Sequence, residues 1–266
     1  GLKSIRLNQM NEPMIRQDIV KFVEYARNAG ILDIYFSSNG SLLSEKMSRG
    51  LIEAGLMRLQ ISLDAATKET YDKIRIGGDY DKIIRNIDRF LEIREEMGTR
   101  LPLLRVNFVR VPENIHELDM FTEMWKDKAD LIGIQDVLGI MEKYDKSKKE
   151  GYDSSVEKFN CAQPYQRMTV RSNGHILPCC LFHGIDIPVA KLKHGIEGVE
   201  MKGDDGIFFK DDEARKRVSS LMIRSIEEAW NSDEMKYFRD IHKKGEYWRN
   251  PSCKKCVESS YHTAEN

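Results

Sequence analysis

Cys161-Ala-Gln-Pro-Tyr-Gln-Arg-Met-Thr-Val-Arg-Ser-Asn-Gly-His-Ile-Leu-Pro-Cys179-Cys180 is the stretch around which the second half of this chain must fold. A short segment near the end of the chain, Pro251-Ser-Cys253-Lys-Lys-Cys256, completes it. All five cysteines of the chain lie in these two segments, and the first 160 residues contain none. Thiols placed at random would seldom gather in this way, so the distribution predicts one shared site.

Four thiolates can hold either zinc or an iron–sulfur cluster, and spacing alone favours neither. The candidate ligands are Cys161, either Cys179 or Cys180, and the pair Cys253 and Cys256, whose spacing lets two sulfurs reach one centre. The plainer alternatives are a structural zinc site and unligated buried thiols. A disulfide framework fits poorly, because the count is odd and no secretory signal is present, which indicates a reducing compartment such as the cytoplasm.

The alternating run after Met168 and the Asn173-Gly174 pair predict a tight β-hairpin. The pair favours a type I′ turn, in which both central residues have positive φ. Such a hairpin would return Cys179 to the neighbourhood of Cys161.

Composition sets limits on the partners of the protein. The chain has 266 residues, 41% of them hydrophobic, with a formal net charge of −1. No apolar run approaches the roughly 20 residues of a membrane helix, and no global charge attracts nucleic acid or anionic lipid. We therefore expect neither a nucleic acid nor a membrane as partner.

The first half of the chain alternates strand and helix patterns, which predicts parallel strands joined by right-handed crossovers. In such folds the chemistry lies in the loops at the carboxyl ends of the strands, here residues 10–13, 37–40, 62–64 and the region after Val109. The predicted strands cover residues 2–7, 31–36, 56–63, 103–111 and 131–138; the predicted helices cover 15–29 and 115–126 and begin near Ser44, Thr67 and Tyr80.

The pattern changes after residue 143. Residues 144–160 are charged and weakly patterned, which predicts a linker between a domain at 1–143 and one at 161–266. Residues 185–217 are rich in Gly, Lys and Asp and predict a long loop, and residues 225–242 predict a helix with breaks near Asn231-Ser232.

These motifs together resemble the radical S-adenosylmethionine (SAM) enzymes that carry a C-terminal SPASM or twitch domain with a single auxiliary cluster. Met10-Asn-Glu-Pro13 is similar to the loop that binds the SAM amino group, and Ser38-Asn-Gly40 and Ser62-Leu-Asp64 are similar to two further loops of that family. The resemblance implies an α/β fold: a partial (β/α)6 TIM-like barrel lacking its first strand, followed by a small cysteine-rich domain with a hairpin and a helix. It also implies two sets of site residues. The set for SAM is Asn11, Glu12, Pro13, Ser38, Asn39, Ser62 and Asp64, and the set for an auxiliary 4Fe–4S cluster is Cys161, Cys179, Cys253 and Cys256, with Cys180 left out.

One departure from the family is large, because the Cys-x3-Cys-x2-Cys motif that holds its catalytic cluster is absent. We expect that the segment carrying it precedes Gly1, together with a second 4Fe–4S cluster, and that this chain alone does not cleave SAM. The resemblance implies hydrogen abstraction by a 5′-deoxyadenosyl radical, with the auxiliary cluster as electron acceptor. The substrate would be a small polar molecule, a sugar or a peptide, and the electron donor a flavodoxin or ferredoxin. The alternatives are a non-catalytic or partner-dependent auxiliary-cluster subunit and a zinc-stapled binding domain.

Several other polar residues have a plainer interpretation. Glu12 suits a helix cap as well as a cofactor ligand. Near the strand ends lie Arg75, Asn107, Arg110 and Gln135, within reach of a substrate, although surface ion pairing is the default for the arginines. The histidines near the cysteines in sequence, His175, His183 and His262, are expected not to be ligands because four thiolates suffice.

Overall fold

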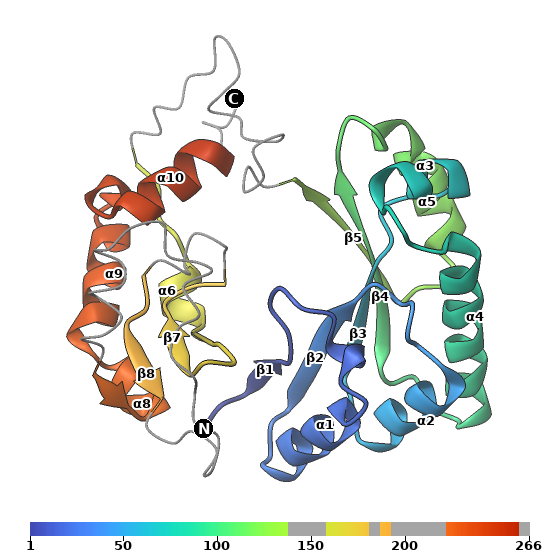
Figure 1. Cartoon of the computed structure of the whole chain (residues 1–266), viewed down its shortest axis with the longest axis horizontal. Helices are drawn as coiled ribbons and strands as arrows, with labels where there is room; N and C mark the ends of the chain where they lie inside the picture. The colour runs from blue at the N-terminus through green and yellow to red at the C-terminus, as the bar shows by residue number, and fades with distance from the viewer. Residues whose placement is uncertain (138–157, 181–186, 193–221, 261–266) are drawn as a thin grey trace. The chain divides into compact units, whose positions relative to one another are not determined.

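The computed structural model describes residues 1–137, 158–180, 187–192 and 222–260. The chain divides into two compact units, Gly1–Val137 and Leu138–Asn266, each with its own sheet (Figure 1). The predicted linker lies outside the described residues except for 158–160. Within the described ranges, no helix combines the length and apolar character needed to cross a membrane.

The first unit is built on a five-stranded sheet with the order β1-β2-β3-β4-β5, in which each strand pairs in parallel with the next. This confirms the predicted α/β class and its five parallel strands; the described sheet is open, with β1 and β5 at its edges. The strands are β1 (Ser4–Arg6), β2 (Asp33–Ser38), β3 (Arg58–Ser62), β4 (Leu103–Arg110) and β5 (Leu131–Asp136), and the helices are α1 (Ile19–Asn28), α2 (Glu45–Glu53), α3 (Lys68–Ile74), α4 (Tyr80–Glu96) and α5 (Leu118–Trp125).

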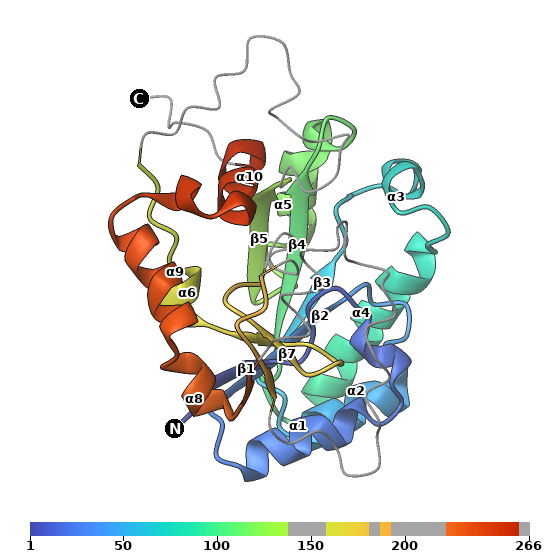
Figure 2. The same ribbon diagram turned by 60° about the vertical axis from the view of Figure 1, so that its left-hand side comes forward.

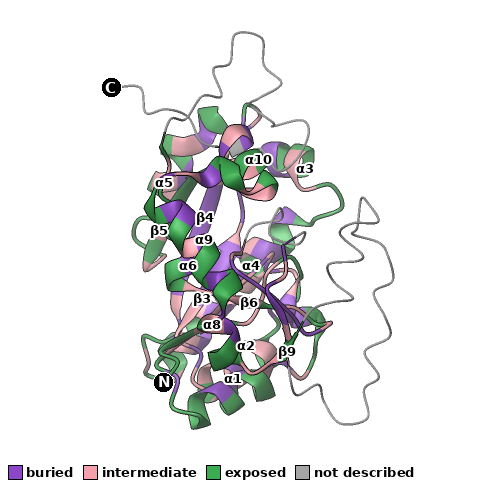
Figure 3. Ribbon diagram, turned by 90° about the vertical axis from the view of Figure 1, so that its left-hand side faces the viewer, coloured by how far each residue is buried: buried purple, intermediate pink, exposed green. Residues whose placement is uncertain are grey.

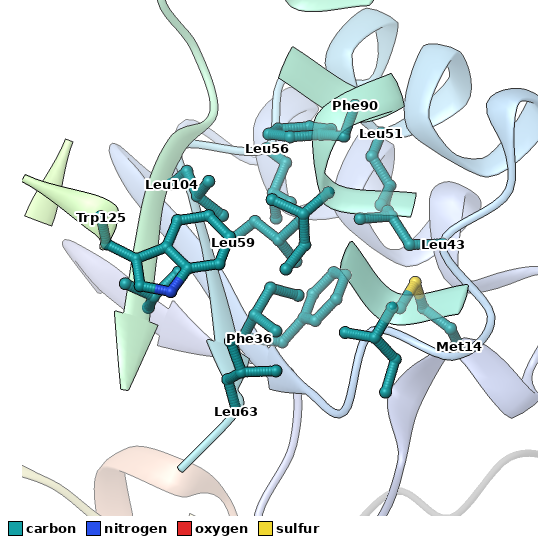
Figure 4. Close-up of a cluster of buried hydrophobic side chains, with 14 of the residues drawn as sticks. Met14, Phe36, Leu43, Leu51, Leu56, Leu59, Leu63, Phe90, Leu104 and Trp125 are labelled. Carbon is teal, nitrogen blue, oxygen red and sulfur yellow. The ribbon is translucent and has the colours of Figure 1, made fainter. Parts of the chain in front are cut away.

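Helices α1, α2, α4 and α5 cover one face of this sheet (Figures 1 and 2). Leu59 and Phe36 from the strands meet Leu51 and Phe90 from the helices, all at 0% exposure, in the cluster shown in Figure 4. Burying each such side chain contributes roughly 1.5–3 kcal/mol. In Figure 3, β4 is largely coloured as buried, whereas exposed residues lie on the outer surfaces of the helices.

Short polar side chains begin the helices as the sequence predicts. The Ser44 hydroxyl accepts from Met47 N at 3.2 Å and starts α2, and Asp79 accepts from Lys82 N at 3.0 Å and starts α4. Helix α1 begins at Ile19, later than the predicted residue 15, because Pro13–Ile15 forms a separate 3₁₀ turn.

The other face of the sheet is polar, because successive strand residues point to opposite faces. Ser37 on β2 pairs in register with Gln60 on β3, and Gln60 pairs with Arg105 on β4. We call this the polar face and define it by Arg6, Ser37, Gln60, Ser62, Arg105 and Asn107.

The second unit has a four-stranded sheet in the order β6-β7-β8-β9, antiparallel except for the β8–β9 pair. Its core contains Ile176, Ala190, Met235, Phe238 and Ile241. The strands are β6 (Thr169–Val170), β7 (His175–Leu177), β8 (Ala190–Leu192) and β9 (Ile223–Arg224), and the helices are α6 (Gln163–Gln166), α8 (Ile226–Trp230), α9 (Asp233–Lys243) and α10 (Pro251–Ser260).

Two local predictions for this unit need correction, and a third is confirmed. The hairpin is present, but only Gly174 of its turn has positive φ (78°), and Gly174 N donates to Arg171 O at 2.9 Å, so the turn is not of type I′. Residues 190–192 of the predicted loop form strand β8, because Ala190 is buried in the core, and the remainder of the loop beyond 187–192 lies outside the described residues. The break predicted near Asn231-Ser232 in the helix at 225–242 is present, since Ser232 caps a second helix through Met235 N.

Candidate functional site

Glu12 joins the loops that follow β1 and β2. Its Oε1 accepts from the Ser38 hydroxyl at 2.9 Å and from Met14 N at 3.1 Å, and its Oε2 accepts from Asn39 N at 2.7 Å. The structure thus brings together three of the residues predicted to bind SAM. The same carboxylate also caps the Pro13–Ile15 turn, so the cap and the cofactor interpretations fall on one side chain.

Asn11 and Asn39 each shape their own loop. Asn11 Oδ1 accepts from Gln9 N at 3.2 Å, and Asn39 Oδ1 accepts from Ser41 N at 2.9 Å. Pro13 is buried at the start of the 3₁₀ turn. These bonds fix the loop backbones at the carboxyl ends of β1 and β2, where ligands bind in parallel sheets.

Asp64 follows β3 in a left-handed conformation, with φ of 62°. It is 4% exposed; its Oδ1 accepts from Val109 N at 2.8 Å, and its other oxygen pairs with Arg75. Asn114 Nδ2 donates to Asp64 O at 2.8 Å. Asp64 therefore has an internal role, joining the loops after β3 and β4, and its assignment to SAM stays a prediction.

Ser62 ends β3 on the polar face and pairs in register with Asn107. Arg110 pairs with Asp136 at the surface, as the default interpretation of this arginine expects. The sequence interpretation did not single out Asn114, which is fully buried and satisfied, or Arg105.

In the second unit, four sulfur-bearing side chains line one pocket. Cys161 precedes α6, Cys179 follows β7, and Cys253 and Cys256 lie one turn apart on α10. The rest of the lining is mostly apolar and includes Pro164, Pro178, Ile187, Phe238 and Val257. The predicted set of four cysteines thus meets at one place, and its role as a ligand set stays a prediction.

The pocket makes these thiols hard to ionise on their own. Burial, followed by the repulsion of neighbouring sulfurs, raises the pKa of Cys256 to about 12 and also raises the pKa of Cys253. Burial also raises the pKa of Cys161. A cationic centre would offset both the cost of burying a thiolate and the repulsion between neighbouring sulfurs, because it favours the thiolates that bind it.

The structure separates Cys179 from Cys180. Cys179 lines the pocket, whereas the Cys180 thiol donates to Gln163 Oε1 at 3.3 Å and lies 3.8 Å from Arg167 Nη1. Spacing had left the two open and the family resemblance implied Cys179; the pocket lining includes Cys179 and leaves out Cys180. None of the five cysteines, all of which the structure describes, forms a disulfide.

Among the described residues, no three His, Cys, Asp or Glu side chains are close enough to hold a single metal ion. The donor set and its apolar surroundings fit an iron–sulfur cluster.

His242 on α9 also lines this pocket and was missed by the sequence interpretation, since it is distant from the cysteines along the chain. It is 3% exposed, its Nδ1 has no hydrogen-bond partner, and burial lowers its pKa. Of the three histidines considered from the sequence, His175 is buried beside Asn173, and His183 and His262 lie outside the described residues.

Two family models match the chain. The radical SAM superfamily matches residues 9–118, which hold the Glu12 loop and most of the parallel sheet. The SPASM iron–sulfur cluster-binding domain matches residues 161–257, which begin and end at the cysteine pocket.

Among curated proteins, the chain is 31% identical over 142 residues to the probable GTP 3′,8-cyclase of Methanocaldococcus jannaschii, covering 53% of this chain and 45% of that protein. It is 32% identical over 163 residues to the probable GTP 3′,8-cyclase of Methanothermobacter thermautotrophicus, covering 60% and 48%. The chain thus spans about half the length of these curated relatives.

Two solved structures share the fold. BtrN in complex with AdoMet and 2-DOIA has a TM-score of 0.52 and 15% identity, covering 98% of this chain and 75% of that one. Streptococcus suis SuiB bound to the precursor peptide SuiA has a TM-score of 0.50 and 20% identity, covering 82% and 56%. At these identities the likeness shows the fold alone.

Proposed function

Because the chain belongs to the radical SAM enzymes with a C-terminal SPASM domain, we propose that the protein abstracts a hydrogen atom from a small polar, sugar or peptide substrate to oxidise or rearrange it. SAM and 4Fe–4S clusters supply the 5′-deoxyadenosyl radical and an electron acceptor in this family. The protein itself positions the cofactors and the substrate.

One observation carries this proposal: Cys161, Cys179, Cys253 and Cys256 come from three separated segments and line one apolar pocket. Buried thiols with raised pKa values are unstable as thiolates without a cation, so a common centre explains why they gather. With every ligand supplied by the chain, the auxiliary cluster would have no iron open to substrate, which suits it to electron transfer.

The first unit contributes the SAM side. We propose that the backbone of the Glu12 loop, fixed by Ser38 and Asn39, receives the methionine end of SAM at the carboxyl edge of the sheet. Ser62 on the adjacent β3 would contact the same cofactor from the polar face.

The relatives do not select one substrate. The curated ones are named for a cyclisation of GTP, and SuiB is bound to a peptide. The proposal therefore includes both rearrangement and oxidation as reactions, and both small molecules and peptides as substrates.

The decisive experiment compares Cys179→Ala with Cys180→Ala after anaerobic iron–sulfide reconstitution. The unmodified chain and the Cys180→Ala variant should each hold about four iron and four acid-labile sulfide in the auxiliary site, with the electron paramagnetic resonance signal of a reduced 4Fe–4S cluster. The Cys179→Ala variant should lose most of both. Equal iron content in the two variants would contradict the ligand assignment.

The same preparation tests the rival functions. One colourless zinc per chain and no sulfide would favour the zinc-stapled binding domain. In a preparation that also carries a Cys-x3-Cys-x2-Cys segment, release of 5′-deoxyadenosine from SAM supports the enzyme, and a loaded auxiliary cluster without SAM cleavage supports the partner-dependent subunit.

A further inference from the structure

Arg105 is unusual among the described arginines on its sheet, because neither an ion pair nor a hydrogen bond holds its guanidinium. It makes no hydrogen bond or ion pair within the described part of the chain, and its Nε is buried without a partner. By contrast, Arg58 on the same face is held by both Asp33 oxygens at 2.6 and 2.8 Å, and Arg6 donates to Ser37 Oγ at 3.0 Å. A partly buried guanidinium without an anion is costly, so the fold retains an unsatisfied positive charge here.

A second unsatisfied group lies two residues further along β4. Asn107 is 7% exposed, and its Oδ1 is buried with no hydrogen-bond partner. Leaving such an acceptor unpaired costs about 1–3 kcal/mol, and few native groups remain in that state. The two groups lie on the same face of one strand, so one ligand can reach both.

Gly133 on β5 leaves the space that these two side chains occupy. It pairs in register with Asn107, and a Cβ at this position would lie 2.3 Å from Arg105 Nη2 and 2.4 Å from Asn107 Oδ1. Glycine weakens a strand interior, so its presence here needs a packing or binding reason. The absence of a side chain lets the guanidinium and the amide lean over β5.

We propose that Arg105 and Asn107, above Gly133, bind an oxyanion of the substrate, a phosphate or a carboxylate. The guanidinium donates to the oxyanion, and Asn107 Oδ1 accepts from a hydroxyl or N–H next to it on the substrate. A cationic ligand would be repelled, and a neutral one would leave the charge uncompensated. This inference rests on the proposed function for the identity of the ligand as substrate.

The position along the strands separates Arg105, but not Asn107, from the predicted SAM residues. Ser62 pairs with Asn107, whereas Arg105 pairs with Gln60, one side chain further from the carboxyl edge on the same face. Two residues along a strand correspond to about 6.6 Å. Arg105 therefore lies deeper along the polar face than the Glu12 and Ser38 loops.

The test is a titration of the 266-residue chain with inorganic phosphate and, separately, with acetate, followed by calorimetry and, for phosphate, by phosphorus NMR. Arg105→Gln should weaken binding by about tenfold or more, since it removes a charge-assisted pair. Gly133→Ala should weaken it similarly without changing the net charge, because the new Cβ displaces the guanidinium. Arg49→Gln, on the outer surface of α2, changes the charge equally and should bind as the unmodified chain does.

Tighter binding of phosphate than of acetate supports the site and assigns a phosphate, and the reverse supports it and assigns a carboxylate. The inference is overturned if the unmodified chain binds neither anion, or if Arg105→Gln and Gly133→Ala bind as tightly as Arg49→Gln. The anion titration requires neither SAM nor a cluster. It therefore tests the oxyanion site independently of the iron and sulfide measurement, which tests the proposed function, and either can fail without the other.

Discussion

Replacing Glu117 with glutamine should destabilise the first unit more than any exposed charge substitution. The Glu117 carboxylate is 2% exposed and lies beneath the turn that leads from Asp64 into α3. Its Oε2 accepts from Ala66 N at 2.7 Å and Thr67 N at 3.2 Å, and its Oε1 accepts from Thr70 Oγ1 at 2.6 Å and from the Thr67 hydroxyl.

The magnitude follows from counting acceptors. A glutamine keeps one acceptor oxygen in place of two. Its NH₂ group is a donor, so the N–H or O–H groups that now donate to the lost oxygen would have no acceptor. Each buried donor left unpaired costs about 1–3 kcal/mol, so we expect a loss of about 2–4 kcal/mol in the free energy of unfolding. That is a large share of the roughly 5–15 kcal/mol that stabilises a typical domain.

The assay is urea unfolding, followed by fluorescence and circular dichroism, at pH 7 and at descending pH. Burial works to raise the pKa of Glu117, but the hydrogen bonds from Thr67, Thr70 and the backbone outweigh it, so the folded pKa lies below 4.5. The stabilisation is therefore present above pH 4.5 and is lost as the pH falls through the folded pKa. Without this titrating group, Glu117→Gln should lose less stability over that interval.

A matched control is Glu92→Gln on the exposed surface of α4, which should stay within about 0.5 kcal/mol of the unmodified chain. If Glu117→Gln unfolds at the same urea concentration as this control, the carboxylate does not hold the turn and the reasoning is refuted.

Three further predictions concern other buried or capping groups. Because burial lowers the pKa of His242, the free energy of unfolding of the metal-free chain should fall as the pH drops below about 6.5. His242→Gln should reduce this pH dependence. If the free energy of unfolding falls equally with pH in both chains, the prediction is wrong. Ser225→Ala removes the capping box of α8, in which the Glu228 side chain accepts from Ser225 N, and should cost about 1 kcal/mol in thermal unfolding. The half-buried Ser41 caps no helix, so Ser41→Ala should cost little. Asn114→Ala removes the hydrogen bonds of the Asn114 side chain to Val111 N, Asp64 O and Val109 O. It should lower the free energy of unfolding by about 3 kcal/mol in the same urea assay. An unchanged free energy of unfolding would indicate that water replaces the amide.

Most of the fold follows from local pattern. The helical spacing of Ile83, Ile87 and Phe90 predicts a buried face, and these three side chains do lie against the sheet, because apolar periodicity acts over one helix and needs no distant partner. Ser44 caps α2 for the same local reason. The cysteines could be grouped from sequence because thiols are rare and their clustering is conspicuous.

What sequence could not supply depends on long-range geometry. Arg105 looks like an ordinary charged strand residue, and only its lack of any described hydrogen-bond or ion-pair partner, beside Gly133, distinguishes it. His242 reaches the cysteine pocket through the packing of α9. The turn at Asn173-Gly174 was assigned the wrong type because the pair marks a turn without specifying how many residues it uses.

Helix α10 carries two of the four proposed ligands one turn apart, is started by Asn250 Oδ1 accepting from Ser252 N and Cys253 N, and buries little beyond Val257 against Tyr247. On the proposed assignment, the inorganic centre fastens this last helix to a segment more than seventy residues earlier, so iron supply governs how long the carboxyl-terminal end stays anchored. Without that centre, α10 should be among the first parts of the described second unit to exchange its amide hydrogens.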